Sequence, residues 1–222
     1  MTRERLLVGA RQAFARVGYA ATTNKIIAEA AGLTANAIYH YYPSKADLYA
    51  AVYGEVHDIV QRSFEHDLAT NDTFLDRFAA TLDASVRLNR MDPSITGFVV
   101  NVPYETQRHP ELVELLAPYR AKRQSMPGRM VADAVAMGEL APDVDPAAVR
   151  DLLNAVFSGL ARLHNYACDT ERHARAVEAM KRLIMGTLVQ PTDTDEPDVP
   201  GVPGVPVGDA CPQVVDGRQA MS

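Results

Sequence analysis

The stretch TTNKIIAEAAGLTANAIYHYY, residues 22–42, decides how the N-terminal part of this chain folds. It begins with a threonine, Thr22 or Thr23, that can cap a short helix with apolar residues at helical spacing. Gly32 ends that helix, because glycine permits a tight turn with positive φ. Thr34 can cap a second short helix, which ends before the next proline. Two short helices joined by a glycine-containing turn are typical of the helix-turn-helix unit.

A helix-turn-helix unit binds DNA by placing its second helix in the major groove, where the N-terminal residues reach the base edges. Asn36 suits a bidentate contact with adenine, and the Ala and Thr methyl groups suit contacts with thymine methyls. Lys45, Thr23 and Tyr39 have the reach and chemistry for phosphates. The spacing by itself also fits an ordinary helical hairpin with no role on DNA.

The remainder of the chain also has helical patterns, so the predicted fold class is all-α. A first helix precedes the quoted stretch, and Ser44 with Asp47 forms a capping box that opens a helix over about 45–66. Pro118 and Pro127 should kink or split one later helix, 111–138. The helices predicted downstream lie near 73–90, 94–107, 111–138, 146–166 and 170–189.

The region from Arg5 to Val52 resembles the DNA-binding domain of the TetR/AcrR family of bacterial transcription regulators. The resemblance implies a three-helix DNA-binding domain followed by a larger helical domain. It also implies a homodimer on a palindromic operator, usually repressing transcription until a small-molecule effector binds. The matching residues are Ala13-Phe14, Gly18-Tyr19, Ala21-Thr22-Thr23, IAEAAGLT at 27–34, IYHYYPSK at 38–45, and Leu48.

The resemblance also implies which residues contact double-stranded operator DNA. Thr23 and Lys25 look like phosphate or backbone contacts, and Lys45 looks like a phosphate clamp. Asn36-Ala37 stands where Gly-Thr is frequent in the family, so the operator sequence cannot be inferred from those of other family members. The base-reading and groove-flanking residues would be Thr34, Ala35, Asn36, Ala37, Tyr39 and His40.

Charge is unevenly distributed along the 222 residues. The net charge of −6 argues against a nucleic-acid partner, but residues 1–48 hold six bases and three acids, a net of +3. Residues 191–222 hold six acids, one base and six of the 14 prolines. We predict that this Pro/Gly/Val-rich acidic tail is disordered and inert, or competes with DNA for a basic face. It follows a helix-turn-helix domain over 1–60 and a ligand-binding and dimerisation domain over 61–190.

The second domain is predicted to carry the dimer interface and the ligand pocket. Amphipathic stripes over 146–166 and 170–189 would pair with their copies, or would simply complete the monomer core. Met and aromatic side chains suit an adaptable apolar pocket, although each also fits ordinary core packing. Arg108 and nearby bases would bind an anionic ligand such as an acyl-CoA, or form a solvated face. The candidate pocket residues are Met91, Phe98, Tyr104, Met130, Phe157 and His164.

Several classes of protein are disfavoured by what the sequence lacks. No apolar run is long enough to span a bilayer and no signal peptide is evident, so we expect a cytoplasmic protein with no membrane partner. No Gly-rich phosphate loop, nucleophile elbow or zinc-protease motif is present, so we expect neither an enzyme nor a cofactor. His164 and Cys168 have metal-ligand spacing and His173 follows, but the sequence fixes no third ligand, so no metal is predicted and a metal or redox sensor is the lesser alternative. The alternatives are an all-α enzyme or small-molecule-binding protein, and a DNA-binding protein controlled by a protein partner.

Overall fold

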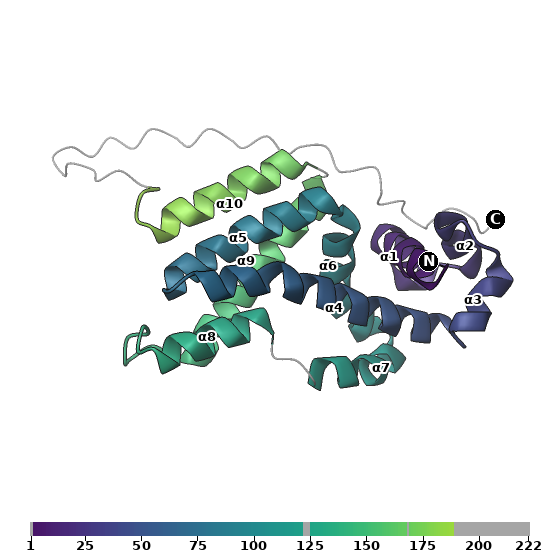
Figure 1. The fold of residues 1–222 in the computed structure, drawn as a ribbon, viewed down its shortest axis with the longest axis horizontal. Coiled ribbons are helices and arrows are strands. Elements are labelled where there is room, and N and C mark those ends of the chain that lie inside the picture. The colour runs from purple at the N-terminus through teal and green to yellow at the C-terminus, as the bar shows by residue number, and fades with distance from the viewer. Residues whose placement is uncertain (1, 122–124, 168, 189–222) are drawn as a thin grey trace, which may run out of the picture.

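The computed structural model of the chain describes residues 2–121, 125–167 and 169–188 (Figure 1). These residues form ten α-helices and no strand, which confirms the all-α prediction. None of these helices is both long and apolar enough to cross a membrane. They are α1 (Thr2–Ala21), α2 (Asn24–Ala31), α3 (Ala35–Tyr41), α4 (Lys45–Thr70), α5 (Phe74–Met91), α6 (Pro93–Arg108), α7 (Pro110–Ala121), α8 (Met126–Ala136), α9 (Pro146–Ala167) and α10 (Thr170–Ile184).

Helices α1, α2 and α3 gather at one end of the molecule (Figure 1). Thr23 is the N-cap of α2, and its hydroxyl accepts a hydrogen bond from the backbone N–H of Ile26 at 3.3 Å. Gly32 ends α2 with a φ of 63°, as the turn requires. Thr34 is the N-cap of α3, but its side chain makes no capping hydrogen bond. The predicted two-helix unit is therefore present.

Helix α4 connects the two ends of the molecule (Figure 1). It opens at Ser44, whose hydroxyl accepts from the N–H of Asp47 at 3.1 Å, and continues to Thr70. It therefore passes the predicted 60/61 domain boundary without a break, and that boundary stays a prediction. The predicted 111–138 helix is two helices, α7 and α8, with Pro127 in the first turn of α8. The predicted tail, 191–222, lies outside the described residues.

The buried residues form two clusters. In the first, aromatic residues of the N-terminal helices pack against α6: the rings of Phe14 and Tyr49 are 5.0 Å apart, and those of Tyr49 and Phe98 are 4.9 Å apart. The second cluster lies among α4, α5, α8, α9 and α10, and includes the ring pair Phe78 and Phe157. Because α6 contributes to the first cluster, the N-terminal helices share a core with the C-terminal part of the chain.

Candidate DNA-binding surface and ligand cavity

Helix α3 presents the predicted base-reading residues at the end of the molecule. Ile38 is 2% exposed and anchors the helix to the first core, whereas Tyr39 beside it is 60% exposed. A seven-residue helix held by one buried side chain leaves most of its surface available to a groove. Of the predicted residues, Ala37 is half-buried, and those exposed are Thr34, Ala35, Asn36, Tyr39 and His40.

Thr23 and Lys25 lie at the start of α2, and both are exposed. The Thr23 hydroxyl accepts the capping hydrogen bond from Ile26, and a hydroxyl that accepts still has its own proton to donate. Thr23 is thereby held in an orientation from which it could donate to a phosphate oxygen. The structure places both residues on the surface, as a phosphate contact requires.

Lys45 is placed differently from the phosphate clamp that we expected. Its ammonium donates to the carbonyls of Tyr19 at 2.8 Å and Thr22 at 3.0 Å, and lies 4.4 Å from the centroid of the Tyr19 ring. Burial lowers the pKa of Lys45. Lys45 therefore caps the C-terminal end of α1, a stabilising position for a cation. A phosphate contact by Lys45 would require it to leave these carbonyls, and that contact stays a prediction.

Arg5 has a structural role that sequence reasoning missed. Its guanidinium donates to the carbonyls of Ala31 at 3.0 Å and Gly32 at 3.1 Å. It thus fixes the turn between α2 and α3 from helix α1. Because its partners lie 26 and 27 residues away in sequence, no local spacing pattern could have identified the contact.

The end of α1 is held by a carboxylate from α6. Gly18 has a φ of 77° and interrupts the helical geometry, so the next N–H needs a partner outside the helix. The Oε1 atom of Glu105 accepts from the N–H of Tyr19 at 2.8 Å, and both residues are buried. The Nε2 atom of His109 lies 3.7 Å from the other carboxylate oxygen. This contact joins the DNA-binding helices to a helix of the C-terminal part.

A second connection is made by Arg11, whose side chain is 4% exposed. Its guanidinium lies 3.2 Å from Glu55 Oε2 and 2.6 Å from Asp92 Oδ2, and donates to Ser94 Oγ at 3.0 Å. Burial raises the pKa of Glu55, and the Arg11 charge opposes that shift. Helices α1 and α4 and the junction between α5 and α6 are therefore joined by one buried cation.

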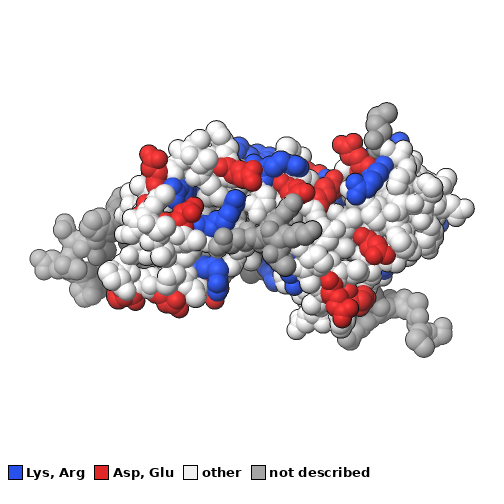
Figure 2. Space-filling model, turned by 60° about the horizontal axis from the view of Figure 1, so that its bottom comes forward, with Lys and Arg blue, Asp and Glu red and all other residues white. Residues whose placement is uncertain are grey.

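Figure 2 shows one face of the molecule, and on that face basic and acidic side chains are interspersed. This face therefore carries no single continuous basic stripe. The whole chain has a net charge of −6 and residues 1–48 have a net charge of +3, so bases in that N-terminal region would attract a phosphate backbone.

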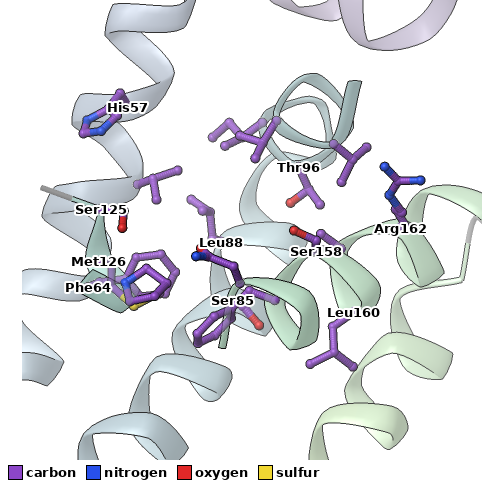
Figure 3. A pocket seen from close by; sticks show the side chains of 18 of the residues that line it. His57, Phe64, Ser85, Leu88, Thr96, Ser125, Met126, Ser158, Leu160 and Arg162 are labelled. Atoms are coloured by element: carbon purple, nitrogen blue, oxygen red, sulfur yellow. The ribbon is translucent and has the colours of Figure 1, made fainter. Parts of the chain in front are cut away.

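A cavity of about 300 Å³ lies between the helices of the C-terminal part (Figure 3). Twelve of the 21 residues that line it are apolar and nine are polar, a combination found in small-molecule sites. Helices α4, α5, α6, α8, α9 and α10 all contribute to it. The lining residues include Phe64, Leu88, Thr96, Met126, Ser158 and Arg162.

Of the predicted pocket residues, the structure places only Phe157 on this wall. Phe98 and Met130 are fully buried in the first and second cores, and Met91 and Tyr104 are exposed, at 69% and 50%. The side chain of His164 and the whole of Cys168 lie outside the described part of the structure. Contact of the six predicted pocket residues with a ligand therefore stays a prediction. Four of them, Met91, Phe98, Tyr104 and Met130, lie outside the cavity wall.

The two faces of α6 explain why Phe98 does not reach the cavity. Phe98, Val102 and Glu105 follow each other at helical spacing and pack toward α1. Thr96 and Val99, on another face, line the cavity. Apolar periodicity showed that α6 is buried, but the residues that meet α1 and those that meet a ligand have the same chemical character.

Comparison with known proteins gives two matching family models. Residues 6–52 match the model for "Bacterial regulatory proteins, tetR family", and residues 74–189 match the "BetI-type transcriptional repressor, C-terminal" model. The second match alone covers more than half of the chain. The chain belongs to the TetR family of bacterial regulatory proteins. The resemblance seen in residues 5–52 is thus confirmed, and this TetR protein is a DNA-binding transcription regulator.

Relatives of this TetR protein are similar over most of its length. The "HTH-type transcriptional regulator UidR" of Escherichia coli strain K12 is 24% identical over 188 residues, which is 84% of this chain and 93% of UidR. The solved structure of Salmonella enterica GusR is 26% identical and has a TM-score of 0.61, covering 84% of this chain and 95% of GusR. FadR from Bacillus subtilis, solved "in complex with stearoyl-CoA", is 16% identical with a TM-score of 0.62, covering 83% and 98%, and shows the fold alone.

Proposed function

We propose that this TetR-family regulator is a homodimeric repressor that binds a palindromic operator through α3 and leaves it when a small molecule occupies the cavity. The observation that carries the proposal is the exposed face of α3, where Asn36 and Tyr39 project beside the buried anchor Ile38. The family to which the chain belongs favours this function over the all-α enzyme that the sequence alone also allowed.

The homodimer is supported by apolar side chains that remain on the surface of α9 and α10. Leu152 is 62% exposed and Leu183 is 54% exposed. A second copy would remove this surface from water if 146–166 and 170–189 pair with their copies as a helical bundle. Dimerisation would also set the distance between two copies of α3, and two half-sites one helical turn apart require that distance.

Release by a ligand is supported by the helices that border the cavity. Helix α6 lines it and also holds the end of α1 through Glu105. Helix α4 lines it through Val60 and Phe64 and begins at the C-terminal end of α3. A ligand that favours one arrangement of α4 and α6 would change operator affinity by the difference between its affinities for the two arrangements.

Fluorescence anisotropy with labelled DNA from upstream of the chain's own gene tests this function. We expect a specific complex containing two chains, and a loss of affinity of about 5- to 140-fold for Asn36→Ala, the value of one bidentate base contact. Tyr39→Ala should also weaken binding. Tyr104→Ala is the matched control, because Tyr104 is similarly exposed but lies on α6. The proposal fails if no specific complex forms at low salt, or if Asn36→Ala and Tyr39→Ala both bind like the unmodified chain.

A further inference from the structure

We infer that the cavity takes an amphiphilic carboxylate, with an apolar body and one negative charge that Arg162 receives. This inference rests on the proposed function, since it names the ligand class for the same cavity. Three features of the cavity support it: its volume, the sign of its charge, and the grouping of two hydroxyls with the Arg162 guanidinium.

The volume limits the size of the ligand. A cavity of about 300 Å³ equals about ten times the volume that one water molecule occupies in the liquid. Carbon atoms joined by bonds pack more closely than separate waters, so a ligand on the order of ten to fifteen non-hydrogen atoms fits. A thioester of coenzyme A is several times larger and would have to extend out of this partly open cavity.

The charge of the wall selects an anion. Among the described residues that line the cavity there is no Asp or Glu, whereas Arg162 lines it with a charge that is permanent at any physiological pH. Arg162 forms no ion pair with another described residue. A cationic ligand would lie beside a like charge, while a carboxylate would accept charge-assisted hydrogen bonds from the guanidinium.

The arrangement of the wall fits a molecule with two unlike ends. Figure 3 shows Thr96, Ser158 and Arg162 grouped on one side of the cavity. Ser158 and Arg162 are four residues apart on α9, so they share a helix face, and Thr96 comes from α6. Two hydroxyls and a guanidinium can together satisfy both oxygens of one carboxylate. Phe64 and Met126 lie on the other side, together with His57 and Ser125, and would contact the apolar body.

The test uses three probes that share a ten-carbon chain and differ in the charge of the head group. Isothermal titration of the full-length protein with decanoate, 1-decanol and decyltrimethylammonium, each below its micelle concentration, compares an anion, a neutral molecule and a cation. We expect decanoate to bind at least tenfold more tightly than 1-decanol, and decyltrimethylammonium to bind most weakly. Stearoyl-CoA, a larger probe, should bind more weakly than decanoate.

Variants of Arg162 isolate the contribution of its charge. Arg162→Gln should remove the preference for decanoate over 1-decanol, and Arg162→Lys should keep most of it. Because Arg162 is exposed, both should fold, as the helical circular dichroism signal will show. Arg150→Gln is the matched control: Arg150 is exposed on the same helix but is not part of the cavity wall, so the preference should not change.

The inference is overturned if decanoate does not bind, if the three head groups bind equally, if stearoyl-CoA binds more tightly, or if Arg162→Gln keeps the preference. Its failure is distinguishable from that of the proposed function, because operator binding is measured separately on the ligand-free protein. Operator binding without decanoate binding would refute only the inference about the carboxylate ligand. Decanoate binding without operator binding would refute only the proposal that the protein is a repressor.

Discussion

Replacing Glu105 with alanine tests the contact that joins the DNA-binding helices to α6. The Oε1 atom of Glu105 accepts from the N–H of Tyr19 at 2.8 Å, directly after Gly18 interrupts the α1 hydrogen-bond pattern. Glu105 and Tyr19 are each 7% exposed, so water has little access to the abandoned N–H. Glu105→Ala therefore leaves a buried backbone donor without its partner.

The expected loss follows from the type of hydrogen bond. A hydrogen bond to a charged group contributes about 1.5–3 kcal/mol to the free energy of unfolding. For a protein of this size each kcal/mol lowers Tm by about 2–4 °C, so Glu105→Ala should lower it by about 3–12 °C. Glu105→Gln keeps an acceptor oxygen and should lose about half as much. Operator affinity should fall in the alanine variant, because the end of α1 is no longer positioned against α6.

Urea denaturation followed by circular dichroism, with calorimetry for Tm, measures both variants. Glu111→Ala is the matched control: its carboxylate lies 3.6 Å from the same histidine, His109, but its side chain is 53% exposed. An exposed pair of this kind contributes about 0–1 kcal/mol, so the control should change little. If Glu105→Ala costs less than about 0.5 kcal/mol, or no more than Glu111→Ala, then the buried contact does not support the fold.

Two further predictions concern packing and pH. Gly9→Ala should lower the free energy of unfolding, measured by urea denaturation, by about 1–3 kcal/mol, because the new Cβ would lie 2.6 Å from the backbone nitrogen of Ala31. This loss is expected although alanine favours helices more than glycine does. A stabilised variant would refute the close crossing of α1 and α2. For Glu55, burial raises the pKa in the folded protein above 4.5, so the unmodified chain loses stability relative to Glu55→Gln as pH rises through the interval just above 4.5. Over that interval the free energy of unfolding of the unmodified chain should fall relative to that of Glu55→Gln, and the difference should then level off. A difference that does not depend on pH would contradict the raised pKa of Glu55.

The sequence by itself determined where the helices lie and several of their ends, although α4 continues to Thr70 and α10 ends at Ile184 rather than near 189. The Ser44 cap, the Gly32 turn and the break before Pro127 depend on residues within about four positions of each other, and all are present. The exposed face of α3 followed for the same reason, because Ile38 must face inward and its neighbours must then face outward.

Only the tertiary structure decided what those helices touch. Lys45 reaches the end of α1, and Glu105 accepts from Tyr19 across 86 residues. No pattern of near neighbours in sequence contains such contacts. In the same way, periodicity marked Phe98 as buried but did not show that it faces α1 rather than the cavity, where Arg162 lies instead. Hydrophobic spacing predicts that a side chain is buried, but only the packing of whole helices determines which residues it contacts.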